Sequence, residues 1–108
     1  MKIKWTEKAL SEYLQTIDYW NNRNKSNEYS HKIEKAVNEE LIEINKDPLF
    51  LSKYSEKLKM FRKIFFKGKF SLFYKVDFQE SVIYITFFRS NKQKPIYITK
   101  QLIQKNNK

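Results

Sequence analysis

The chain has 108 residues, 41% of them hydrophobic, and a net charge of +10, which suits one folded domain with a single core. It contains no Cys and one His, His31, which excludes a disulfide framework or a thiolate zinc site and argues against a His-based metal centre or catalytic triad. Residues 1–5 lack an apolar signal core and no apolar run approaches membrane-spanning length, so we expect a cytoplasmic protein. We also expect that it needs neither cofactor nor metal.

The first half of the chain predicts a short extended segment followed by a helical hairpin. Ile3 and Trp5 lie on one side of the extended segment, and Thr6 is the expected N-cap of the first helix. That helix is predicted to run to about Asn22, with apolar residues at helical spacing that end in Trp20, which we assign to the core. Ser26 is the expected cap of a second helix, which ends at residues 47–48 because the residue before proline disfavours the α region.

Three strands are predicted to follow, over residues 60–67, 70–76 and 82–89. The short links at residues 67–69 and 77–80 favour an antiparallel meander. On the middle strand, four apolar residues at alternate positions should meet the helices: Phe70, Leu72, Tyr74 and Val76. Ser71, Phe73 and Lys75 then face the other way. The register of residues 60–67 stays open, because two-residue and three-residue turns put Arg62 on opposite faces.

These elements predict an α+β fold: an N-terminal strand, a helical hairpin and an antiparallel β-meander, in one domain over residues 1–108. The last strand is expected to end at residue 89, because residues 90–95 are polar. Residues after about 99 are expected to fray.

Charge is unevenly distributed along the chain. Residues 1–51 hold eight Lys or Arg and nine Asp or Glu, whereas residues 52–108 hold fourteen and three, a net charge of +11. Such a field attracts polyanions or acidic proteins. The alternative is that the charge contributes to solubility alone, but that does not explain why the net positive charge is concentrated in residues 52–108.

No strong catalytic motif is present, and the informative pattern is a set of cations interleaved with aromatic residues. The cations are Arg62, Lys63, Lys67, Lys69, Lys75 and Arg89. Cations flanked by rings suit single-stranded nucleic acid, and they equally suit an acidic amphipathic peptide. The opposing interpretation is that most of the rings are core, that Arg62 pairs with a helix Glu, and that Arg89 is a cation facing water at a strand end.

Several short motifs, in their order and spacing, resemble the RelE/ParE toxin superfamily. They are residues 3–9 (IKWTEKA), 18–20 (DYW), 45–48 (NKDP), 61–63 (FRK), 71–76 (SLFYKV) and 88–89 (FR), with Pro95 near the family's usual ending. The resemblance covers roughly residues 2–97. It implies the toxin of a type II toxin–antitoxin pair, held inactive by a cognate acidic antitoxin.

The resemblance leaves three functions open. RelE-like members cut messenger RNA on the ribosome and are enzymes, whereas ParE-like members poison DNA gyrase as binding proteins. A third possibility is a non-toxic protein of the same fold that binds nucleic acid or a partner. Fold analogy does not separate these functions, because function resides in the site.

The ParE-like function is favoured, because Ser71 stands where the RelE-like nuclease carries a central Arg and Ile64 replaces a second basic residue. Three residues remain as catalytic candidates for the nuclease alternative: Arg62, Arg89 and Tyr97. Six are the expected contacts to target or antitoxin: Arg62, Lys63, Lys69, Phe73, Lys75 and Arg89.

Overall fold

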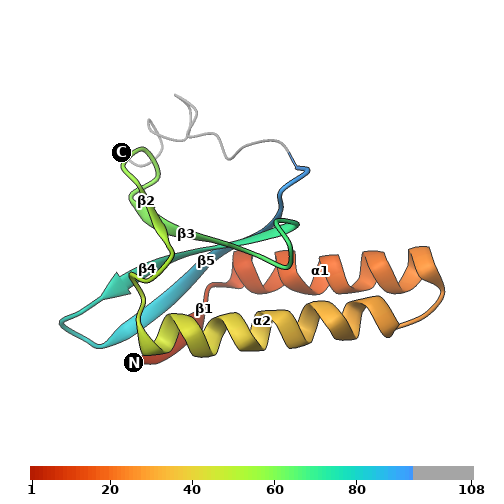
Figure 1. Cartoon of the computed structure of the whole chain (residues 1–108), viewed down its shortest axis with the longest axis horizontal. Helices are drawn as coiled ribbons and strands as arrows, with labels where there is room; N and C mark the ends of the chain where they lie inside the picture. The colour runs from red at the N-terminus through yellow and green to blue at the C-terminus, as the bar shows by residue number, and fades with distance from the viewer. Residues whose placement is uncertain (94–108) are drawn as a thin grey trace.

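A computed structural model of the chain describes residues 1–93 and has an α+β fold (Figure 1). Its elements in chain order are β1 (Lys2–Trp5), α1 (Glu7–Asn24), α2 (Glu28–Lys46), β2 (Lys53–Ser55), β3 (Met60–Phe65), β4 (Phe70–Asp77) and β5 (Val82–Ser90). The predicted strand, helical hairpin and three-strand meander are all present. Tyr97, Pro95 and the predicted frayed end lie outside the described residues.

The sheet has five strands in the order β1-β5-β4-β3-β2. The meander β3-β4-β5 is antiparallel, β2 adds antiparallel to β3, and β1 pairs in parallel with β5, so the sheet is mixed. Both helices lie on one side of the sheet (Figure 1). We call the opposite side, which faces away from the helices, the outer sheet face.

The helix boundaries differ slightly from the prediction. Thr6 caps α1, as expected, by accepting a 3.1 Å hydrogen bond from the Ala9 amide. The helix continues two residues beyond Asn22 and stops where Lys25 takes a left-handed conformation. The N-cap of α2 is Asn27 and not Ser26, although the Ser26 hydroxyl accepts a 3.2 Å hydrogen bond from the Glu28 amide.

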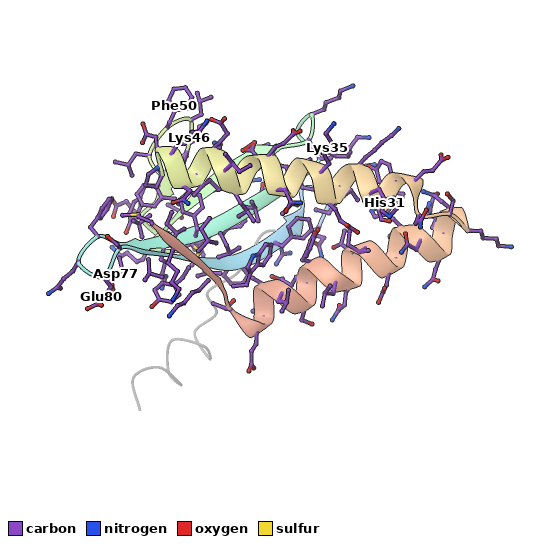
Figure 2. All side chains as sticks on the ribbon, turned by 90° about the horizontal axis from the view of Figure 1, so that it is seen from below. His31, Lys35, Lys46, Phe50, Asp77 and Glu80 are labelled. Carbon is purple, nitrogen blue, oxygen red and sulfur yellow. The ribbon has the colours of Figure 1, made fainter. Side chains whose placement is uncertain are left out.

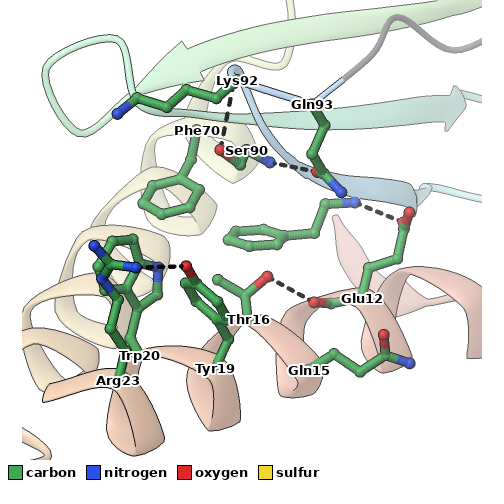
Figure 3. Close-up of a pocket in the computed structure, with 11 residues that line it drawn as sticks. Glu12, Gln15, Thr16, Tyr19, Trp20, Arg23, Phe70, Ser90, Lys92 and Gln93 are labelled. Atoms are coloured by element: carbon green, nitrogen blue, oxygen red, sulfur yellow. Dashed lines mark hydrogen bonds between the residues drawn. The ribbon is translucent and has the colours of Figure 1, made fainter.

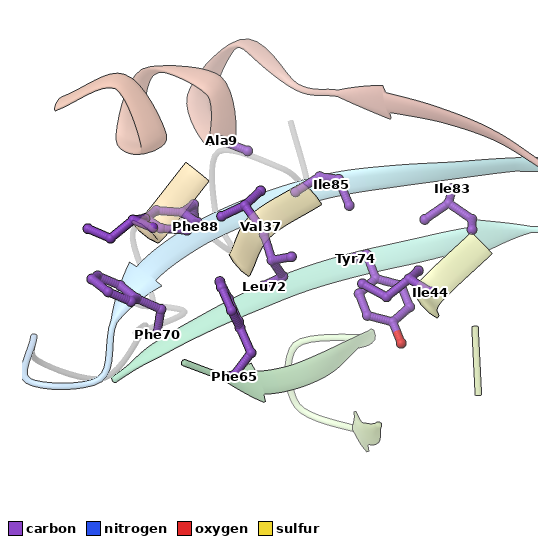
Figure 4. Packing of buried hydrophobic residues seen from close by; sticks show 11 residues of the cluster. Ala9, Val37, Ile44, Phe65, Phe70, Leu72, Tyr74, Ile83, Ile85 and Phe88 are labelled. Atoms are coloured by element: carbon purple, nitrogen blue, oxygen red, sulfur yellow. The ribbon is translucent and has the colours of Figure 1, made fainter. Parts of the chain in front are cut away.

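The core lies between the helices and the sheet (Figure 4). Phe70, Leu72 and Tyr74 of β4 are buried there, as predicted, and Val76 packs against them partly buried. The rest of the buried cluster comes from both helices and from β3 and β5: Ala9, Ile33, Val37, Ile44, Phe65, Ile83, Ile85 and Phe88. Burial of these apolar side chains is the main stabilising term of the fold.

The link between β3 and β4 settles the register that the sequence left open. Phe65 pairs with Phe70, so the link has four residues, 66–69, of which Phe66, Lys67 and Gly68 have positive φ. Arg62 therefore pairs with Phe73 on the outer sheet face. Its neighbour Lys63 points to the helix side.

A β-bulge in β5 reverses its side-chain alternation. Phe73 pairs with Phe87 and Tyr74 pairs with Ile85, which leaves Thr86 as an extra residue. The Thr86 hydroxyl donates a 3.1 Å hydrogen bond to the Phe73 carbonyl oxygen. Because of this extra residue, both Phe88 and Ile85 can reach the same core.

Candidate functional site

The outer sheet face carries cations from five strands. Strand alternation and register place there Lys2, Lys4, Lys53, Arg62, Lys75 and Arg89. Among the strand residues on this face, the only carboxylate is Asp77. Positively charged side chains gathered on one face attract anionic groups of a partner and raise its rate of association.

Arg62 is held in a fixed position on this face. Its Nε donates to the Ser71 hydroxyl and its Nη2 donates to the Asn91 side-chain oxygen, both at 3.0 Å. The Ser71 hydroxyl itself donates to Asn91 Oδ1. The guanidinium also lies 5.5 Å from the centre of the Phe73 ring. Asn91 is in turn anchored by donating to the Gly68 carbonyl oxygen at 2.7 Å.

Arg89 lies across β4 from Arg62. It pairs with Ser71 on one side of β4, and Arg62 pairs with Phe73 on the other. Both guanidinium-bearing residues are half-buried. Two Arg side chains flanking one strand can contact phosphate or carboxylate groups, for which the planar guanidinium is well suited.

The other predicted contact residues have different environments. Lys63 is only 5% exposed, and its Nζ lies 3.3 Å from a Glu40 carboxylate oxygen, so we leave it out of the candidate binding surface. The buried pair with a helix Glu, which the sequence offered as an alternative for Arg62, occurs at Lys63. Phe73 is 7% exposed and contributes mainly packing. Lys69 lies over the rings of Tyr29 and Phe66, and Tyr29 belongs to α2.

A second candidate region is a groove between α1 and the end of β5, with a volume of about 660 Å³ (Figure 3). Trp20 lies in this groove and packs partly buried against the core, so its predicted core role holds only in part. A neighbouring hollow of about 230 Å³ shares Trp20, Phe70, Ser90 and Lys92 with the groove. Sequence reasoning missed this groove, because its walls come from segments far apart in the chain.

The groove lies beside a part of β5 that β1 does not cover. The pairing of β1 ends at Ile85, and beyond it the Phe88 amide donates a 3.1 Å hydrogen bond to Glu12 Oε1 (Figure 3). The Ser90 amide likewise donates to Gln93 Oε1 at 2.9 Å. Glu12 therefore satisfies one amide, and Gln93 another, of the strand edge that β1 leaves uncovered.

No acid–base pair stands out among residues 1–93. His31 is exposed on α2, on the same helix as Lys35 and at the end away from Lys46 (Figure 2). Burial raises the pKa of Tyr13, with the Glu34 charge adding to the effect. Within the described part of the chain, no three His, Asp or Glu side chains gather as a possible metal site, and neither helix is long and apolar enough to cross a membrane.

Comparisons with known proteins found no matching protein family, no similar curated protein and no similar solved structure.

Proposed function

We propose that this protein is the toxin of a type II toxin–antitoxin pair, that it acts in the ParE-like manner by binding and poisoning DNA gyrase, and that an acidic antitoxin neutralises it. The observation that carries the proposal is the cationic outer sheet face, where cations from five strands suit the binding of an anionic partner. The order of strand, helical hairpin and meander, together with the short motifs of the RelE/ParE superfamily, gives further support.

The residues at the nuclease positions favour the binding function over the enzyme. Ser71, at the central position, is fully buried and its hydroxyl is engaged with Arg62 and Asn91. A hydroxyl offers no positive charge to a phosphate in a transition state. Loss of one such charge-stabilising group typically costs about 10²–10³ in rate. Ile64, at the second position, is apolar and 49% exposed.

The RelE-like endoribonuclease is the second candidate, and one observation favours it. Arg62 and Arg89 flank β4 on the outer sheet face, where they can together contact a phosphate of single-stranded RNA. Lys75, which is exposed on β4 itself, adds a third cation. Binding RNA in this way would still leave the cleavage step without the central Arg.

Regulated expression in a bacterial host tests both functions. If the protein poisons gyrase, we expect growth arrest with DNA breaks, and both should disappear when the host carries a toxin-resistant gyrase. Primer extension on messenger RNA with purified ribosomes tests the alternative. Codon-phased cleavage that is lost in Arg62→Ala or Arg89→Ala would replace the gyrase proposal with the enzyme. Growth without any arrest would leave the non-toxic binding protein as the explanation.

A further inference from the structure

The groove beside α1 is elongated along the helix. Its α1 wall presents Glu12, Thr16, Trp20 and Arg23, which follow one another at three- or four-residue spacing (Figure 3). Eleven helical steps from Glu12 to Arg23 correspond to about 16 Å. A groove of this length fits a peptide segment better than it fits a compact small molecule.

The floor of the groove is aromatic. The Phe70 and Phe88 rings are almost fully buried and are stacked with their centres 5.4 Å apart. Trp20, which lines the groove, meets edge-on at 4.6 Å the ring of Tyr29, which lines the neighbouring hollow. Trp20 and Tyr29 are both half-buried, so part of each ring remains accessible. Such a floor can accept a large apolar side chain as an anchor.

Cations surround this aromatic floor. Arg23 donates to the Tyr19 hydroxyl at 3.2 Å and lies 5.8 Å from the Trp20 ring, while Lys69 lies 5.7 Å from the Tyr29 ring in the neighbouring hollow. Lys92 lines both the groove and the hollow. Among the described lining residues the only carboxylate is Glu12, and it already accepts the Phe88 amide.

We propose that this groove, together with the neighbouring hollow, binds an acidic amphipathic segment of a partner protein, with an apolar side chain on Trp20 and carboxylates on Arg23, Lys69 and Lys92. Charge complementarity selects this occupant: residues 94–108 of the chain itself carry four Lys and no carboxylate, so they cannot supply the matching charge. The inference rests on the proposed function in one respect, that an acidic antitoxin is the expected source of the segment.

The groove and the outer sheet face are separate surfaces. Phe70 and Phe88 reach the groove from the helix side of the sheet, whereas Arg62 and Lys75 lie on the opposite side. A segment bound in the groove therefore does not compete directly for the cations of the outer sheet face.

Fluorescence of Trp20 provides the test. The chain has two Trp residues, so Trp5→Phe leaves Trp20 as the only Trp reporter in the full-length protein. The probe is a synthetic peptide of about twelve residues, long enough to span the groove as a helix, with Leu and Phe on one face and Glu on the other. A matched peptide carries Lys in place of each Glu. We expect a saturable change in Trp20 emission with the acidic peptide and none with the basic one.

Two charge-reversal variants make the test specific. Arg23→Glu with Lys92→Glu should weaken binding of the acidic peptide about tenfold or more, whereas Lys35→Glu with Lys57→Glu, an equal charge change at exposed positions that do not line the groove, should alter it by less than about twofold. Circular dichroism checks that both variants fold. Absence of saturable binding, or equal weakening in both variants, would overturn the inference.

The peptide titration and the growth assay fail independently. Growth arrest without peptide binding would contradict only the proposed binding of a peptide in the groove. Peptide binding without growth arrest would contradict only the proposed toxin function.

Discussion

Lys63 is a basic residue that the fold has taken out of solvent. It lies on β3 next to Arg62, yet its side chain points to the helices and pairs with Glu40 of α2. The side chain of Glu40 is 19% exposed, although the Oε2 atom that faces Lys63 is buried. A pair in this position links the sheet to α2, and removing only one partner leaves the other charge uncompensated.

We predict that Lys63→Ala lowers the free energy of unfolding by about 3 kcal/mol, the lower end of the range for breaking a buried ion pair, because Glu40 is partly solvated. Urea denaturation measures the change. The double variant Lys63→Met with Glu40→Leu should recover much of the loss, since no unpaired charge remains. Lys57→Ala, at an exposed position, is the control and should stay within about 0.5 kcal/mol of the parent protein. A single variant as stable as the parent would show that the pair contributes nothing.

At the scale of secondary-structure elements, the sequence predicted both helices and the three-strand meander, because periodicity and turn residues are local signals. The short strand β2 (Lys53–Ser55) was not predicted, because its three residues show no clear apolar alternation. The parallel pairing of β1 with β5 is a contact between the two ends of the described chain, which no local pattern encodes.

The candidate site was predicted less completely than the fold. Arg62, Lys75 and Arg89 were identified from the pattern of cations interleaved with aromatic residues, but whether Arg62 or Lys63 faces outward depends on the four-residue link at 66–69. Asn91 was missed, because a polar residue after the last strand looks like part of a loop. Its hydrogen bond to Arg62 joins residues 29 positions apart in the sequence.

Tyr74 connects β4 to the segment after α2. Its hydroxyl donates a hydrogen bond to the Pro48 carbonyl oxygen. Burial raises the pKa of Tyr74 above its usual value of 10.0, and the Glu40 and Asp47 charges add to this effect, while Ser52 partly offsets it. Because the folded pKa is the higher one, the neutral hydroxyl stabilises the fold fully below about pH 10, and this stability is lost as the pH rises through the folded pKa.

We therefore predict that Tyr74→Phe costs about 1 kcal/mol at neutral pH, through the lost hydrogen bond, and makes stability less sensitive to alkali. Urea denaturation of both proteins from about pH 8 to about pH 11 measures this dependence. Tyr84→Phe, a half-exposed position on the neighbouring strand, controls for the loss of a hydroxyl. An alkaline slope as steep in Tyr74→Phe as in the parent protein would contradict the assignment.

At the scale of the whole molecule, the fold sorts the charge of the chain into surfaces. The helices cover one side of the sheet (Figure 1). The strand registers place the cations of β1, β4 and β5 on the other side. Lys4 and Lys75 both pair with Tyr84, one from each neighbouring strand, so residues far apart in sequence form one local cationic cluster. Such a cluster affects encounter with an anionic partner more than it affects folding.

We predict that Lys4→Glu with Lys75→Glu abolishes the growth arrest that the proposed toxin function implies, while leaving the fold intact, because it reverses the charge of this cluster at exposed positions. The matched control is Lys32→Glu with Lys35→Glu, an equal charge change at exposed positions of α2, which carries the labelled Lys35 in Figure 2. It should arrest growth as the parent does. Thermal unfolding of both variants should stay within a few degrees of the parent, as expected for surface substitutions of about 0.5 kcal/mol. If the Lys4 and Lys75 variant still arrests growth at equal expression, the outer sheet face is not the surface that engages the target. If both variants lose activity together, net charge alone, and not this cluster, explains the effect.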